Sequence, residues 1–249
     1  MKFMGAFAMT AAAVAVLIGQ PAVAAEGDTV NAIKARGMLQ CGVSTGTNIG
    51  KSTLDDKGNW KGFNVDFCHA LAAAVLGDSE KVQFVPLVWK NAFAALTSSK
   101  IDVLARGATY TYQRDAELRF GWPGIYFYDG ISFMVTKQSG VKSAKDMDGA
   151  TICVVPASST LAFVGDYFRS NGMKFTPVLT DRPEQARANM ESGRCDAWAN
   201  ELVNLAANRT VLKNPEKFTV LAEPLTREPT GPVVLQHDPR FADIVRWTL

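Results

Sequence analysis

The pattern of hydrophobic and polar positions predicts alternating strands and helices in the first half of the chain. Short apolar runs rich in β-branched residues predict strands at 39–43, 82–86 and 101–105. Between them, apolar residues recur every three or four positions, which predicts helices from about 64 to 77 and from 91 to 98. This order predicts a parallel sheet with helices on both faces, an α/β fold.

Two local features complete this first unit. Asn64 stands where a side chain could cap the helix that ends at Gly77. The residues from 44 to 61 hold glycines, paired aspartates and Gly58-Asn59, which predict a loop of successive turns.

The same order of elements recurs in the second half of the chain. Strands are predicted at 151–155, 175–179 and 195–199, and helices at 159–170 and 182–191. The chain therefore contains the strand-helix-strand-helix-strand unit twice.

The segments that flank this second unit differ from it. Residues 121–137 form two extended apolar runs with no helix between them, which is typical of a hinge between two lobes. Residues 233–236 predict a further strand, and Asp238 and Pro239 predict the start of a last helix. No helix stop signal precedes Leu249, so we expect the chain to be incomplete at its C-terminal end.

The N-terminal residues have the features of a secretory signal peptide. Lys2 precedes an uncharged apolar run at 4–18, and Ala22 and Ala24 form an A-x-A cleavage pattern. A membrane anchor is the alternative, but the run is shorter than the ~20 residues that a span needs. We therefore assign residues 1–25 to a cleaved signal peptide and the mature chain to an exported location.

The charge of the mature chain is close to neutral. The full sequence has 26 Lys and Arg against 24 Asp and Glu, and cleavage removes Lys2. No block of like charge indicates nucleic acid or a membrane surface as a partner. The roughly 225 residues that remain suffice for one large domain or two lobes.

The four cysteines permit two disulfides in an exported protein. Cys41, Cys68, Cys153 and Cys195 allow three pairings, among which the sequence alone does not choose. They are widely spaced and form no C-x-x-C cluster, so we do not expect a zinc site. We expect no other metal and no cofactor. Buried small apolar residues are the alternative.

Sequence motifs of catalysis are few. His69 and His237 fall on a helix flank and before a helix, and no nucleophile-elbow motif or metal-binding histidine pair occurs. Gly50-Lys51-Ser52 looks like the end of a phosphate-binding loop, but Thr45 stands where that motif needs glycine. The sequence therefore gives no catalytic residues.

The stretch from Ile101 to Phe120 is the strongest candidate for a binding site. Gly107, Thr109 and Arg114 follow the strand at 101–105 and would offer backbone N–H groups, a hydroxyl and a guanidinium. In open α/β sheets, ligands bind beyond the carboxyl ends of the strands. An ordinary surface arginine is the alternative, but this position predicts a site for the carboxylate of a free amino acid.

The second unit offers a matching set of groups. Ala157 to Thr160 reads ASST at a predicted helix N-terminus, where anions are favoured, although Ser158 or Ser159 could equally cap the helix. Glu201 follows the strand at 195–199 and could pair with an ammonium group, or simply be an acid at a helix start.

Two aromatic residues stand at strand ends in the first unit. Trp89 and Tyr110 could form apolar walls of a cleft, and core packing explains either position equally well.

Three motifs resemble those of a known family. GFNVDFCHALAAAV, KIDVLARGATYTYQRDAELRF and GRCDAWANE are similar to the periplasmic solute-binding proteins of polar amino acid ABC transporters, bacterial extracellular solute-binding protein family 3. The resemblance covers residues 28–249 and is strongest to the general L-amino-acid-binding branch. It implies a two-lobed periplasmic-binding-protein clamp of type II in which the chain crosses twice between the lobes.

The resemblance also implies an organisation and a function. Lobe 1 would comprise residues 26–132 and 231–249, and lobe 2 residues 133–230. The protein would be a periplasmic monomer that captures free amino acids and delivers them to the membrane permease subunits of an ABC importer. It would not be an enzyme.

Roles for individual residues follow from the matched motifs. Arg114 matches the arginine that takes the α-carboxylate of the ligand, with Thr109 and Gly107 as neighbouring hydroxyl and backbone donors. Ser158 and Ser159 match the pair that grips this carboxylate from the second lobe.

Other positions depart from the family pattern. Glu201 matches the acid that binds the α-ammonium, where the family usually has aspartate. Gly107 and Ala108 stand where this branch often has larger polar residues, and Ala157 where glycine is common. Residues 44–51 lack the aromatic that relatives place over the ligand side chain, so a roomier pocket or a different ligand is expected.

A clamp that closes by a hinge motion also implies a disulfide pattern. A bridge between lobes would oppose this motion, so we expect any bridges to be Cys41–Cys68 and Cys153–Cys195.

Two other functions are considered. An enzyme on the same fold, of the cyclohexadienyl dehydratase type, would need an acid or base in the cleft, and only Glu201 is available. A receptor or sensor domain would need a transmembrane continuation, which the sequence does not show.

Overall fold

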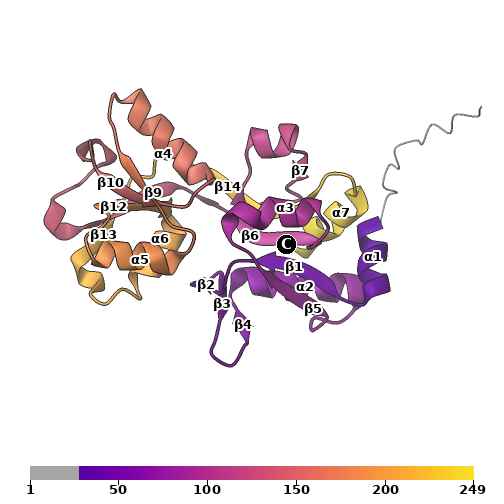
Figure 1. Ribbon diagram of the computed structural model, residues 1–249. Coiled ribbons are helices and arrows are strands. Elements are labelled where there is room, and N and C mark those ends of the chain that lie inside the picture. Colours follow the sequence, from indigo (N-terminus) through magenta and orange to yellow (C-terminus); the bar gives the residue numbers. More distant parts are fainter. Residues whose placement is uncertain (1–27) are drawn as a thin grey trace, which may run out of the picture.

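The computed structural model describes residues 28–249, and these form two α/β halves that lie side by side (Figure 1). Each half is built on its own sheet, and a third, small sheet projects from the first half. The proposed signal peptide, residues 1–25, lies outside the described residues. Within residues 28–249, no helix combines the length and apolar character that a membrane span requires.

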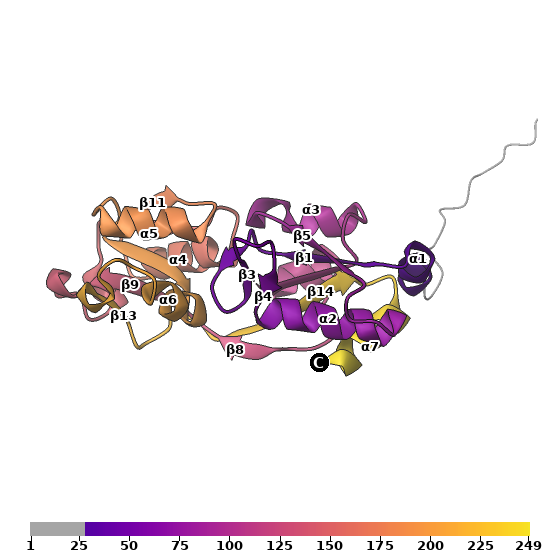
Figure 2. The same cartoon turned by 90° about the horizontal axis from the view of Figure 1, so that it is seen from below.

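The first half is a sheet with helices on both faces. Its strand order is β5-β1-β6-β14-β7, with β8 paired to β14; β1 runs parallel to β5 and β6, and β14 is antiparallel to β6. Helices α1, α2 and α7 cover one face and α3 the other (Figure 2). The bounds are α1 Asp28–Arg36, β1 Leu39–Val43, α2 Phe63–Leu76, β5 Val82–Pro86, α3 Ala92–Thr97, β6 Val103–Thr109, β7 Phe120–Gly121, β8 Phe127–Asp129, β14 Glu228–Leu235 and α7 Pro239–Thr248.

The second half repeats this plan. Its sheet has the order β11-β10-β12-β9-β13, with β10 parallel to β11 and β12, and β9 antiparallel to β12 and β13. Helix α4 packs on one face, and α5 and α6 pack on the other (Figure 1). The bounds are β9 Ile131–Thr136, β10 Thr151–Val154, α4 Ser159–Ser170, β11 Thr176–Leu179, α5 Pro183–Glu191, β12 Ala197–Glu201, α6 Leu202–Arg209 and β13 Phe218–Val220.

The loop predicted at 44–61 is instead a small three-stranded antiparallel sheet. It comprises β2 Thr47–Asn48, β3 Ser52–Leu54 and β4 Trp60–Lys61. The predicted turns do occur, since Gly50 and Gly58 adopt left-handed φ values of 76° and 85°. They are tight turns that join paired strands.

The predicted capping role of Asn64 is wrong. Helix α2 begins at Phe63, and the carbonyl of Gly62 accepts hydrogen bonds from the N–H groups of Val65 and Asp66. Asn64 lies buried inside the first turn, where its Nδ2 donates to Ser52 Oγ at 3.3 Å. Its amide therefore joins the helix to the small sheet.

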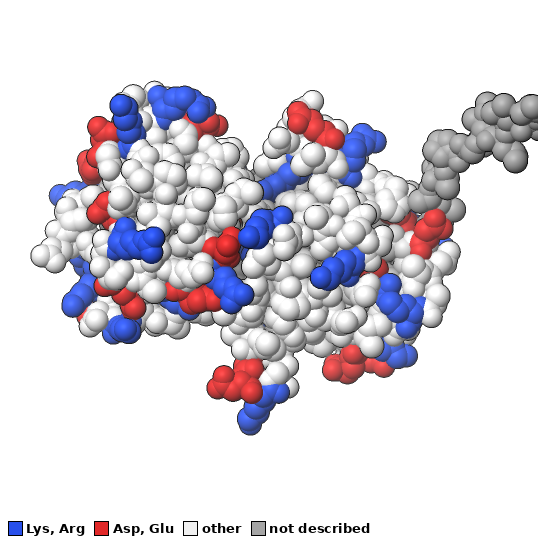
Figure 3. All heavy atoms as spheres, viewed as in Figure 1, with Lys and Arg blue, Asp and Glu red and all other residues white. Residues whose placement is uncertain are grey.

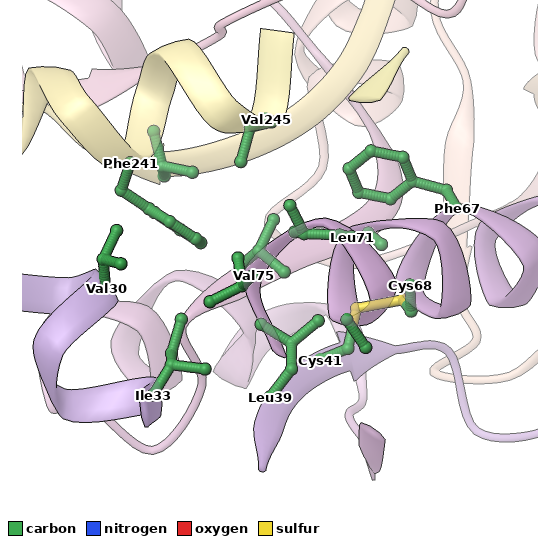
Figure 4. Packing of buried hydrophobic residues seen from close by; sticks show 14 of the residues in the cluster. Val30, Ile33, Leu39, Cys41, Phe67, Cys68, Leu71, Val75, Phe241 and Val245 are labelled. Carbon is green, nitrogen blue, oxygen red and sulfur yellow. A yellow bond between two sulfur atoms is a disulfide. The ribbon is translucent and has the colours of Figure 1, made fainter. Parts of the chain in front are cut away.

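The core of the first half surrounds a disulfide (Figure 4). Leu71 and Val75 of α2 pack toward Phe241 and Val245 of α7, and the Cys41–Cys68 bond joins β1 to α2.

In the second half, Cys153 on β10 pairs with Cys195, two residues before β12. Both expected pairings are confirmed, and each bridge lies within one half.

Two segments cross between the halves and pair with each other. One runs from β8 through Gly130 into β9, and the other runs from β13 to β14. Strands β8 and β14 are antiparallel partners, with Asp129 opposite Glu228. The lobe boundaries at 132/133 and 230/231 stay predictions, as does a continuation past Leu249.

Candidate ligand-binding site

A pocket of about 640 Å³, part of it open to solvent, lies between the two halves. Both halves contribute polar side chains to its lining, which is typical of a cleft that binds a small polar ligand. The first half contributes Asn48, Trp89, Arg106, Gly107 and Thr109, and the second Val155, Ser158, Ser159, Thr160, Asp181, Pro183, Asn200, Glu201, Asn204 and Asn208.

Six of the eight residues predicted for the site line this pocket. They are Trp89, Gly107, Thr109, Ser158, Ser159 and Glu201. The other two, Tyr110 and Arg114, line an adjoining groove whose wall also includes Ser158 and Ser159. The two serines therefore stand at the junction of pocket and groove.

Two hydrogen bonds join the halves at this junction. The hydroxyl oxygens of Thr109 and Ser159 are 3.3 Å apart, and Trp89 Nε1 donates to Ala157 O at 3.1 Å. The carboxyl end of β6 therefore meets the N-terminus of α4.

Arg114 is a buried arginine rather than a surface one. It lies on a single π-helical turn, Gln113–Glu117, and is 8% exposed. Its Nη1 donates to Thr109 O at 2.7 Å, and its guanidinium stands over the rings of Trp89 and Phe93. Burial lowers the pKa of Arg114, while Glu228 and Glu201 act in the opposite direction. A partly desolvated guanidinium with donors to spare is suited to bind a carboxylate.

Tyr110 lies at the edge of the groove and is 41% exposed. Its ring stacks on Trp122, and its hydroxyl donates to Asp115 Oδ2 at 2.9 Å. These contacts direct the phenol away from the pocket, so Tyr110 can contribute only an outer wall.

Ser158 and Ser159 differ in what their hydroxyls do. Ser158 caps α4: its Oγ accepts from Leu161 N–H at 3.1 Å and donates to Val155 O at 2.7 Å. The Ser159 hydroxyl instead faces Thr109 across the cleft. Only Ser159 thus offers a side chain to a ligand, whereas Ser158 shapes the turn.

Glu201 precedes the first residue of α6 without capping it. Its Oε2 accepts from Asn204 Nδ2 at 2.6 Å, and Asn204 Oδ1 is buried without a partner among residues 28–249. The Glu201 carboxylate and the Asn204 amide oxygen, which accepts no hydrogen bond in the described chain, together form a group of acceptors. Such a group suits an ammonium or an amide N–H.

Arg106 and Glu228 are among the residues of this region that the sequence did not single out. Arg106 lines the pocket, and Glu228, on β14, is 2% exposed and contacts the lining residue Thr109. Glu228 accepts from Thr109 Oγ1 at 2.6 Å and from Thr226 Oγ1 at 2.8 Å. A charged residue inside the apolar strand pattern was the available signal for Arg106, and one at the start of an extended run for Glu228.

Glu228 gives a testable pH dependence. Burial raises the pKa of this carboxyl above its ordinary value of 4.5, with the nearby Glu201 adding to the effect against the hydrogen bonds from Thr109 and Thr226. The folded state then binds this proton more tightly than the unfolded state. The resulting stability is present below pH 4.5 and is lost as the pH rises through the folded-state pKa.

We therefore expect Glu228→Gln to gain stability relative to the natural chain as the pH rises. Urea unfolding of both proteins at about pH 4 and about pH 7 measures this change. Glu216→Gln, at an exposed position, is the control. A stability difference that is the same at both pH values would contradict the prediction.

Comparison with solved structures defines the class of protein. The chain matches an ABC transporter periplasmic binding protein from Brucella ovis, solved with glutathione bound, with a TM-score of 0.84. The two are 44% identical, and the match covers 90% of this chain and 70% of that one. The fold of this chain, with two sheets and a pocket between the halves, is thus that of a type II periplasmic binding protein.

Sequence comparison identifies the family. The model of the bacterial extracellular solute-binding proteins, family 3, matches residues 39–245, and this chain belongs to that family. The general L-amino acid-binding periplasmic protein AapJ of Rhizobium johnstonii is 42% identical over 96% of this chain and 70% of its own length. The glutamate/glutamine/aspartate/asparagine-binding protein BztA of Rhodobacter capsulatus is 42% identical over 90% of this chain and 66% of its own. The resemblance seen in the sequence is confirmed.

Proposed function

We propose that this chain is the amino-acid-binding component of an ABC importer and works in the periplasm as a monomer. The observation that carries the proposal is the pocket between the halves together with its adjoining groove. Arg114 lines the groove, Glu201 lines the pocket, and Ser159 lines both, so donors and acceptors stand on opposite sides. A free amino acid presents an anion and a cation on one carbon and needs both kinds of partner. The names of AapJ and BztA agree with this class of ligand.

The α-carboxylate is assigned to the junction of pocket and groove. Arg114 reaches this point from the groove, and the N-terminus of α4, which begins at Ser159, favours an anion there. The α-ammonium then points into the pocket toward Glu201.

The hydrogen bonds of Thr109 refine its role. A hydroxyl has one proton, and that of Thr109 is donated to Glu228 Oε2 at 2.6 Å. What remains toward the cleft is an oxygen that accepts hydrogen bonds. We therefore assign Thr109 to the α-ammonium as an acceptor, rather than to the carboxylate as a donor.

Capture follows from the two-sided lining. The ligand binds to the groups of one half, and the other half then closes over it by a hinge motion through the two crossing segments. The Thr109–Ser159 and Trp89–Ala157 hydrogen bonds and the Lys90–Asp181 ion pair join the halves, so closure would make these contacts and opening would break them. The closed protein then docks on the permease subunits of the importer. The signal peptide at residues 1–25 provides export to this compartment.

The enzyme alternative lacks support. The relatives AapJ and BztA are named as binding proteins. We assign Glu201 to the ammonium group of the ligand. Asp181, the other carboxylate among the described residues that line the pocket, lies 3.9 Å from Lys90 Nζ.

A thermal-shift screen of the twenty amino acids and several cyclic dienyl acids tests this function. A ligand that binds only the folded state, at 100 times its Kd, stabilises that state by about 2.7 kcal/mol. We expect a clear rise in Tm with at least one amino acid and no product on incubation. If no amino acid raises Tm, or if a cyclic acid is turned over, the proposed function is wrong.

A further inference from the structure

The cleft holds more positive charge than an amino-acid backbone requires. Three cations, Lys51, Arg106 and Arg114, stand around the end of β6 against two carboxylates, Glu201 and Glu228. The proposed function uses Arg114 for the α-carboxylate and Glu201 for the α-ammonium. Arg106 and Lys51 then have no assigned partner.

Arg106 has donors available to the pocket. Its guanidinium stands 5.4 Å from the ring centre of Trp89, and Nη1 donates to Leu87 O. Among residues 28–249, no carboxylate comes within 4 Å of its nitrogens. Burial lowers the pKa of Arg106 to about 10, only partly offset by Glu201, as expected for a desolvated cation without a close counter-ion.

Lys51 lies directly behind Gly107 and is 5% exposed. Its Nζ is 5.3 Å from the ring centre of Phe127 and has no carboxylate partner within 4 Å in the described chain. A Cβ added at Gly107 would lie 3.6 Å from this Nζ. Lys51 therefore places a buried positive charge next to Gly107, which lines the pocket.

The other charges at the pocket do not cancel this excess. Asp181 lies at the edge, half exposed, and its carboxylate is 3.9 Å from Lys90 Nζ. The charges of Asp181 and Lys90 cancel, so this pair adds no net charge to the cleft. A zwitterion with an uncharged side chain would leave the inner cleft positive, whereas a ligand with one further negative charge would balance it.

We infer that the ligand carries a second carboxylate and that Arg106, supported by Lys51 behind Gly107, forms its subsite. This inference rests on the proposed function and names the class of ligand. The second carboxylate has two sources, the side chain of an acidic amino acid or the terminal carboxylate of a short γ-glutamyl peptide. Cationic side chains are excluded from the subsite.

Calorimetry on the natural chain with L-glutamate, L-glutamine, L-arginine and glutathione tests the class. We expect at least one of the two dicarboxylates, glutamate or glutathione, to bind about tenfold tighter than glutamine, and arginine to bind more weakly still. Preference for glutamate identifies the side chain as the source, and preference for glutathione identifies the peptide. Glutamine or arginine as the tightest ligand overturns the inference but leaves the proposed function intact. If none of the four binds and the amino-acid screen is also negative, the proposed function itself fails.

The variant Arg106→Met tests the residue, because it keeps a long side chain against Trp89 and removes the charge. We expect its affinity for the preferred dicarboxylate to fall by about tenfold to a hundredfold, and that for a ligand with a neutral side chain by less than about threefold. Arg169→Met on the exposed face of α4 is the matched control and should change neither. Equal losses for both ligands would show that Arg106 only supports the pocket wall, and would overturn its assignment.

Discussion

Replacing Arg114 with alanine is expected to abolish measurable amino-acid binding. Removing one partner of a buried, hydrogen-bonded charge pair costs about 2–5 kcal/mol, which corresponds to a loss of affinity of about thirtyfold to several thousandfold. Arg114 is buried, and the ligand carboxylate would be enclosed without its counter-ion. The expected effect is therefore the largest of any single truncation in the site.

Calorimetry measures this loss, and circular dichroism of the same sample checks that the fold is retained. Arg114→Lys keeps the charge but not the planar fork, so it should recover only part of the affinity. Arg169→Ala, on the surface of α4, is the control for loss of an arginine. An unchanged affinity in Arg114→Ala would refute the role of this residue and leave Arg106 as the candidate for the α-carboxylate.

Removing the Cys153–Cys195 bridge is expected to cost the most stability. The cysteines are 42 residues apart in the sequence, and a closed loop of this length reduces the entropy of the unfolded chain by an amount worth about 4 kcal/mol. Measured effects are often smaller, so we expect a loss of about 2–4 kcal/mol for the double alanine variant.

Urea unfolding, followed spectroscopically at two wavelengths, measures this loss in the free energy of unfolding. The Cys41–Cys68 bridge closes a shorter loop, with a separation of 27, so its removal should cost slightly less. Since each bridge lies within one half, both variants should still bind ligand at low temperature. Loss of binding with unchanged stability would contradict this account.

Most elements were predictable because their signals are local. Helix α4 has the predicted bounds, 159–170, since Ser158 provides an N-cap and the apolar spacing is regular. The small sheet at 47–61 was not predictable, because two- and three-residue strands carry no periodic pattern. Asn64 was misjudged because its hydrogen-bond partner, Ser52, lies on that same sheet.

The candidate site was predictable in part from the rule that ligands of open α/β sheets bind beyond the carboxyl ends of the strands. It placed Gly107 and Thr109 at the carboxyl end of β6 in the first sheet and Glu201 at the carboxyl end of β12 in the second, and these two ends meet at one pocket. This rule does not say in which direction a side chain points. It therefore could not predict that Arg106 lines the pocket while Arg114 lines the groove. Nor could it find Glu228, whose contact with Thr109 spans 119 residues of sequence.

The electrostatic character of the surface agrees with the reading of the sequence. Basic and acidic side chains are interspersed over the visible face of both halves, without a block of one sign (Figure 3).

The pairing of the two crossing segments limits how the halves can move. Strands β8 and β14 share ladder hydrogen bonds, so the connection is a ribbon rather than two independent tethers. A two-stranded ribbon can bend and twist, but it cannot lengthen, because the backbone of each strand is already nearly fully extended. Sliding one strand along the other would break the ladder hydrogen bonds, which run perpendicular to the strands. The halves can therefore change their angle while their separation at the ribbon stays fixed. The connection therefore permits bending between the halves but keeps them at one distance. Gly130 lies at the end of this ribbon, where an added Cβ would lie only 2.5 Å from Thr226 O.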